Sequence, residues 1–136
     1  MNTAIKQARE AYLEKHPFDP KAKAVMALDG NGLPEGFLTM PHLDDVQILA
    51  AKLGVEYLAI CHDEESVEDW ISTVASLAGS RYVSGLIYAN AFRGISDLLG
   101  EIFQEVGVQD TMTSLAIQGW AKDFSENDFT TKENNE

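Results

Sequence analysis

Residues 66–79 have the sequence SVEDWISTVASLAG, and this stretch predicts the clearest helix in the chain. Ser66 followed by Asp69 has the pattern of a capping box, and Gly79 can end the helix in a left-handed conformation. Between them, apolar side chains recur at helical spacing, at Val67, Trp70, Ile71, Val74, Ala75 and Ala78. An amphipathic helix must bury such a face against other elements, so the sequence predicts a domain built from packed helices.

The longest predicted helix follows directly, over Arg81–Val106. Apolar side chains form a stripe along it, made of Tyr88, Ala91, Ile95, Leu98 and Ile102 and widened by Phe92, Leu99 and Phe103. Glycine is costly inside a helix. We therefore expect the close approach of another helix, or a kink, at the small residues Gly85, Ala89, Gly94 and Gly100.

The C-terminal part of the chain is predicted to hold one more helix and a polar tail. The helix opens at Asp110 or Thr111 and continues through Leu115, Trp120 and Phe124. Residues 125–136 are too polar to add to a core, so we expect a disordered acidic tail there.

Two further helices are predicted on the N-terminal side. The first covers Thr3–Lys15, because Pro17 disfavours helix in the residue before it. The second covers Leu43–Leu53, with acidic residues in its first turn and Gly54 at its end. Val55–Cys61 is either a strand or a continuation of this helix, since the apolar spacing runs on through Gly54.

Residues 20–40 have two interpretations. Asp19 and Pro20 suit the start of a helix, which favours a short helix over Ala22–Leu28. The alternative is a β-hairpin in which Lys23–Leu28 pairs with Gly36–Met40 across a glycine-rich loop.

Together these segments predict a mainly α fold. It is a compact single-domain bundle of about five or six helices over residues 1–124, with a small β-hairpin near residues 23–40 as the alternative noted above. The sequence shows no internal repeat and no strand–helix alternation of the kind that builds a parallel sheet.

Charge is the strongest compositional signal, because the chain has a formal net charge of −12. Residues 29–69 contain ten acidic residues against the single Lys52. With a pI near 4.5 we expect no direct binding to nucleic acid and no attraction to anionic membranes. A basic protein is the expected partner.

The single cysteine and the N-terminal segment bear on location. Cys61 can form no internal disulfide, and we expect it to be a small buried hydrophobe in a reducing compartment. Met1–Glu14 lacks the apolar core of a signal peptide. We therefore expect a cytoplasmic protein.

No motif indicates an enzyme or a cofactor. Residues 29–35 look like the start of a calcium loop, but Pro34 and Met40 stand where the loop needs glycine and glutamate. The glycines form neither a phosphate-binding loop nor a dinucleotide fingerprint. We expect no cofactor and no catalytic residues.

A metal site is the chemical alternative. The pair His62–Asp63 resembles the paired residues of metal phosphohydrolases of the HD type. That resemblance implies a metal-dependent phosphohydrolase using His42, His62 and Asp63, with Asp110 as a more distant ligand. Carboxylates and imidazoles near these positions would supply further oxygen and nitrogen ligands, at Asp44, Asp45, Glu64 and Glu65.

The acidic residues give the leading functional hypothesis. If the starts of the helices at Leu43 and Ser66 are neighbours, one negative surface forms from Asp44, Asp45, Glu56, Asp63, Glu64, Glu65, Glu68 and Asp69. Such a surface predicts a small non-enzymatic binding protein that regulates or inhibits a basic partner, including a nucleic-acid-binding partner by charge mimicry. The structural alternative is that acidic first turns only stabilise their helices.

A third hypothesis assigns the chain to a homo-oligomeric structural or assembly subunit. The apolar stripe from Tyr88 to Phe103 is as suited to the core of a homodimer as to the interior of one chain.

Overall fold

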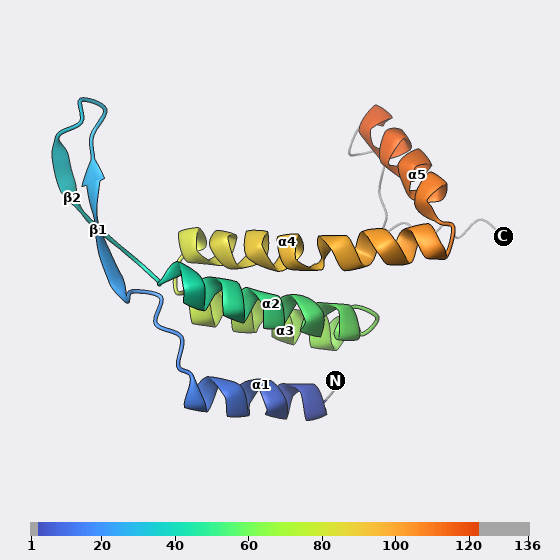
Figure 1. Cartoon of the computed structure of the whole chain (residues 1–136), viewed down its shortest axis with the longest axis horizontal. Coiled ribbons are helices and arrows are strands. Elements are labelled where there is room, and N and C mark those ends of the chain that lie inside the picture. Colours follow the sequence, from blue (N-terminus) through green and yellow to red (C-terminus); the bar gives the residue numbers. More distant parts are fainter. Residues whose placement is uncertain (1–2, 123–136) are drawn as a thin grey trace. The chain divides into compact units, whose positions relative to one another are not determined.

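The structure is a computed structural model and describes residues 3–122 (Figure 1). Within them lie five helices and one hairpin, in the order α1 (Thr3–Lys15), β1 (Lys23–Leu28), β2 (Pro34–Met40), α2 (Leu43–Ile60), α3 (Glu64–Ala78), α4 (Arg81–Glu105) and α5 (Gln109–Ala121). A mainly helical fold with a small hairpin is therefore confirmed.

The chain divides into two compact units, Met1–Ser96 and Asp97–Glu136, with the boundary inside α4. The extent of a single domain over residues 1–124 stays a prediction. The predicted acidic tail, residues 125–136, and Phe124 lie outside the described residues.

The core of the first unit is formed by α2, α3 and the first part of α4. Its buried apolar side chains recur at helical spacing, and they are Val46, Leu49, Ala50, Leu53, Ile60, Trp70, Val74, Ala78, Val83, Ile87 and Ala91. Val83 and Ile87 lie outside the stripe predicted for the long helix, whereas Phe92, Leu98 and Ile102 of that stripe are exposed. Helix α2 continues through Gly54, so Val55–Cys61 is not a strand. The side chains of Ile5, Leu13 and Phe18 pack against this cluster from the N-terminal segment.

The side chain of Trp70 on α3 contacts both of the other helices of this core, α2 and α4. It is 4% exposed, and its indole Nε1 donates a hydrogen bond of 3.1 Å to the Leu53 carbonyl of α2. Its ring lies 5.1 Å from that of Tyr57 on α2 and 5.8 Å from that of Tyr88 on α4. One α3 side chain therefore contacts both neighbouring helices, and its polar atom is satisfied.

Helix α3 starts earlier than the sequence predicts. Asp63 is the residue before its first turn, and Ser66 lies inside that turn with its hydroxyl donating to Asp63 Oδ2 at 2.5 Å. The prediction of Ser66 as the cap is wrong by three residues, because the buried serine faces back toward the real start. The predicted end is confirmed, since Gly79 has φ 68° and its N–H bonds the Ala75 carbonyl.

The short helix predicted over Ala22–Leu28 is wrong, and the hairpin alternative is confirmed. β1 pairs antiparallel with β2, with Val25 opposite Leu38 and Met26 opposite Phe37. The turn decides this outcome, because Asp29 Oδ1 accepts hydrogen bonds from the backbone N–H groups of Asn31 and Leu33. Such an Asx turn reverses the chain and outweighs local helix propensity.

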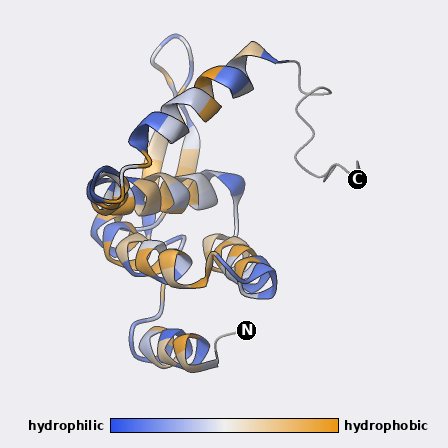
Figure 2. Cartoon of the chain, turned by 90° about the vertical axis from the view of Figure 1, so that its right-hand side faces the viewer, coloured by the Kyte–Doolittle hydropathy of each residue, from blue (hydrophilic) through white to orange (hydrophobic). Residues whose placement is uncertain are grey.

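The second unit contains the end of α4 and α5. The chain leaves α4 through Gly107, which has φ 72°, and the Val108 N–H bonds the Phe103 carbonyl. Among the described residues of α5 no side chain is buried, and hydrophobic residues are interspersed with hydrophilic ones on its surface (Figure 2). Its most exposed apolar side chains are Met112, Leu115, Ile117 and Trp120.

The glycines of α4 do not mark a helix contact. A Cβ built at Gly85, Gly94 or Gly100 would meet nothing within 4 Å in the described part of the chain, so the close approach of another helix is wrong at these three glycines. The alternative, a kink, stays a prediction. The close approach occurs instead at Gly54 of α2, where a Cβ would lie 3.0 Å from the Ala91 carbonyl oxygen and 3.0 Å from Ile95 Cγ2. Gly54 is therefore the position that lets α2 and α4 pack closely.

We predict that Gly54→Ala lowers the free energy of unfolding by about 1–3 kcal/mol, because the added methyl group would overpack the α2–α4 contact. The matched control is Gly85→Ala, where open space leaves only the gain in helix propensity, about 0.5–1 kcal/mol of stabilisation. Urea unfolding of both variants checks the contrast. Equal stabilisation by the two alanines would contradict close packing at Gly54.

Candidate functional site

The eight acidic residues expected to form one patch divide between the two ends of α2. Asp44 and Asp45 lie in the first turn of α2, while Glu56 lies in its last two turns. Because α2 has 18 residues, its ends are about 27 Å apart. The short connection after Ile60 brings the end of α2, not its start, to the start of α3. The two helix starts are therefore not neighbours, and Asp44 and Asp45 are separate from the other six.

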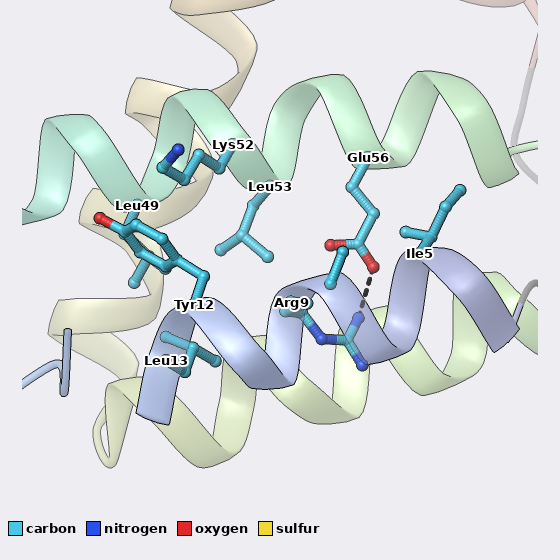
Figure 3. A pocket seen from close by; sticks show the side chains of 9 residues that line it. Ile5, Arg9, Tyr12, Leu13, Leu49, Lys52, Leu53 and Glu56 are labelled. Atoms are coloured by element: carbon cyan, nitrogen blue, oxygen red, sulfur yellow. Dashed lines mark hydrogen bonds and ion pairs between the residues drawn. The ribbon is translucent and has the colours of Figure 1, made fainter. Parts of the chain in front are cut away.

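Two of those six residues are bound inside the molecule by α1. The Arg9 guanidinium donates through Nη1 to Glu56 Oε1 (Figure 3). Through Nη2 it donates to Asp69 Oδ2 at 2.8 Å. Lys6 Nζ lies 3.3 Å from the other Asp69 oxygen. The side chains of Arg9 and Glu56 are only 9% and 10% exposed, and that of Asp69 is 24% exposed. This cluster attaches α1 to both α2 and α3.

The environment shifts the pKa values of the Glu56 and Asp69 carboxyl groups in opposite directions. The hydrogen bond from Arg9 holds the pKa of Asp69 below its usual range, with a further contribution from Lys6. Burial raises the pKa of Glu56 above its usual value, although the Arg9 charge lowers it. The stability that Asp69 contributes is therefore present above its ordinary pKa and is lost as the pH falls through the lowered value.

Arg9 and Glu56 of this cluster line a small cavity between α1 and α2, about 240 Å³ in volume (Figure 3). Apolar side chains form most of its wall, and they are Ile5, Ala8, Leu13, Leu49 and Leu53. At one side, Lys52 Nζ lies 4.5 Å from the centre of the Tyr12 ring. The Arg9–Glu56 pair therefore sits in an apolar contact between helices, which strengthens it relative to a pair in water.

The remaining four acidic residues form the exposed acidic cluster of this protein, defined as Asp63, Glu64, Glu65 and Glu68. The three glutamates are exposed, and Asp63 is half-buried. The Ser66 hydroxyl lowers the pKa of the Asp63 carboxyl by donating a hydrogen bond to it. Glu64 and Glu65 occupy the first turn of α3, where the helix dipole favours negative charge. Four carboxylates are thus concentrated at the start of α3, on the residue before the helix and on its first two turns.

The structure does not assemble the metal site of the alternative hypothesis. His42 directly precedes α2 and His62 follows its end, so the whole helix separates them. Asp110 lies in the first turn of α5, in the other unit. Within residues 3–122 no group of three or more His, Cys, Asp or Glu side chains is placed to hold a metal ion.

The sequence analysis did not identify Arg9 and Lys6 as partners of acidic residues, and it expected a different place for Cys61. The only signal for Arg9 and Lys6 is two cations three residues apart on a helix with an apolar face. Cys61 was expected to be buried, but it is exposed just after α2, so that expectation is wrong. The helix ends one residue earlier than Cys61, and the side chain therefore lies at its end rather than in the core.

Comparison with known proteins returns no match of any kind: no family model, no curated protein and no solved structure matches this chain. Of the helices described, none combines the length and the apolar character needed to cross a membrane.

We predict that Arg9→Met lowers the free energy of unfolding by about 2–4 kcal/mol, because it leaves the buried Glu56 carboxylate without its cation and Asp69 with Lys6 alone. Lys6→Met is the control, since Lys6 is more exposed and such a pair contributes less than about 1 kcal/mol. Urea unfolding measures both. Similar small losses for the two variants would show that the Arg9 cluster does not attach α1.

Proposed function

We propose that this protein is a small, non-enzymatic acidic binding protein that regulates or inhibits a basic protein partner. The contact surface in this proposal is the exposed acidic cluster, Asp63, Glu64, Glu65 and Glu68. The observation that supports it best is the division of the carboxylates. Glu56 and Asp69 are held by Arg9, whereas the three glutamates at the start of α3 face solvent.

The physical argument rests on position as well as charge. The three glutamates lie on a helix anchored by Trp70, so the backbone that carries them is already ordered before a partner binds. With a chain charge of −12, the field around this turn attracts cations and increases the rate of encounter with a basic partner. Salt screens such a field, so association is expected to weaken steeply as ionic strength rises.

We further propose that the basic partner is a nucleic-acid-binding protein. A nucleic-acid-binding protein carries a basic groove for phosphates, and clustered carboxylates can occupy it in place of the nucleic acid. Regulation or inhibition by charge mimicry then follows without any catalytic group. The proposal also keeps the cytoplasmic location that the single Cys61 favours.

We predict that the triple variant Glu64→Gln, Glu65→Gln, Glu68→Gln binds the partner about tenfold to hundredfold more weakly and releases it at lower salt. The control is Asp97→Asn, Glu101→Gln, Glu105→Gln, which removes the same charge from exposed positions of α4. Each protein is used as bait in lysate of the native host and eluted with a salt ramp. Equal loss in both variants would mean that net charge alone, not this cluster, is responsible.

The same experiment also tests whether the protein mimics nucleic acid. Excess duplex DNA added before elution should displace the captured partner from the wild-type bait. A partner that stays bound at any DNA concentration overturns mimicry, and a bait that retains no basic protein at low salt overturns the binding proposal itself.

A further inference from the structure

The contact between α1 and α2 leaves unfilled space along much of its length. Beside the cavity of about 240 Å³ described above lies a second one of about 140 Å³, and Tyr12, Leu13 and Leu49 line both. No side chain of α1 is fully buried. Protein interiors are close-packed and leave few spaces larger than a water molecule, so this contact has room for a ligand.

The larger cavity fits a small and mainly apolar molecule. Its wall is apolar on both sides, with Ile5, Ala8 and Leu13 on α1 and Leu49 and Leu53 on α2. An apolar cavity of about 150 Å³ is sufficient to bind a molecule of the size of benzene. The larger space here is therefore suited to a molecule of about ten non-hydrogen atoms.

The charged groups in the cavity wall differ in whether they have partners. Arg9 and Glu56 bind each other, so neither needs a ligand. Within residues 3–122 the Lys52 ammonium forms no ion pair, and it lies 4.5 Å from the centre of the Tyr12 ring. Figure 3 shows Lys52 and Tyr12 at one side of the cavity and the Arg9–Glu56 pair further along α2. The Lys52 end of the cavity therefore has a cation without a carboxylate.

Local charge indicates which polar group a ligand would carry. Although the chain is acidic overall, the three cations Lys6, Arg9 and Lys52 surround only the two carboxylates Glu56 and Asp69 here. An ammonium group has three hydrogen-bond donors, and bonds from it to a carboxylate are charge-assisted and strong. A cationic ligand would be repelled by Lys52 and would find Glu56 already bound. An anionic group is therefore favoured at this end.

We propose that the cavity between α1 and α2 binds a small amphipathic carboxylate. Its apolar body lies among Ala8, Leu49 and Leu53, and its carboxylate accepts hydrogen bonds from Lys52 Nζ. The ligand contacts both helices and so holds α1 against α2. This site goes beyond the proposed function and does not depend on the acidic cluster at the start of α3.

The first test uses octanoate, which has an apolar chain and one carboxylate, titrated into the full chain and followed by NMR of methyl groups. The methyl signals of Ala8, Leu49 and Leu53 should shift and saturate, with a Kd of about 0.1–5 mM for a ligand of this size. Octylammonium should shift them at least about tenfold more weakly, because its charge is reversed. No saturable shift up to about 20 mM octanoate, or tighter binding of octylammonium, overturns the proposal. Shifts of the hairpin methyl groups in place of these three also overturn it.

A pair of lysine variants tests the carboxylate contact. Lys52→Met keeps an apolar side chain in the wall but removes the ammonium, so octanoate should bind about threefold to tenfold more weakly while octanol binds as before. Lys15→Met is the matched control, since it removes the same charge from an exposed position at the end of α1. Equal weakening in the two variants would mean that net charge alone is responsible, and would overturn the contact with Lys52.

A pair of alanine variants tests the cavity itself. Ala8→Phe places a ring in the space, so the octanoate shifts at Leu49 and Leu53 should be lost. Ala11→Phe adds the same ring at an exposed position of α1 and should leave binding unchanged. Octanoate that binds Ala8→Phe as well as the wild type overturns the site. Circular dichroism checks that both variants keep their helices, and the lysine pair tests the site without filling the cavity.

Discussion

The Arg9 guanidinium, shared between Glu56 and Asp69, is the interaction on which the arrangement of the first unit depends. It connects α1 to α2 and α3 in a contact that is otherwise apolar and contains a cavity. Charges taken out of water in this way are favourable only when each has its partner, so the three residues act as one structural group. The same group removes two carboxylates from the negative surface and so defines the acidic cluster that remains.

The charged and the apolar exposed surfaces of the molecule therefore lie on different elements. Negative charge is concentrated at the start of α3, where Glu64, Glu65 and Glu68 are exposed to solvent. The hairpin instead exposes apolar side chains on both faces. Long-range attraction and close apolar contact are separate physical requirements of association, and here they belong to separate elements.

Most helices of the fold could be predicted from the local sequence, but the division of the acidic residues between bound and exposed positions could not. The spacing around Trp70 was sufficient to predict α3, and Pro17 was sufficient to place the end of α1. The hairpin was misassigned because the Asx turn at Asp29 outweighs the helix signals at Asp19 and Pro20. The division of the acidic residues could not be read from the sequence, because Arg9 is 47 residues from Glu56 and 60 from Asp69. Only the packing of α1 brings them together.

The central claim is that Arg9 binds Asp69 in solution, and a carbon-detected NMR titration of the Asp69 carboxyl group tests it most directly. The account predicts that Asp69 stays ionised well below the ordinary aspartate pKa of about 3.9, and that its pKa returns toward that value in Arg9→Met. An ordinary pKa for Asp69 that is the same in both proteins would contradict the account, because Arg9 would then not hold the Asp69 carboxylate in solution.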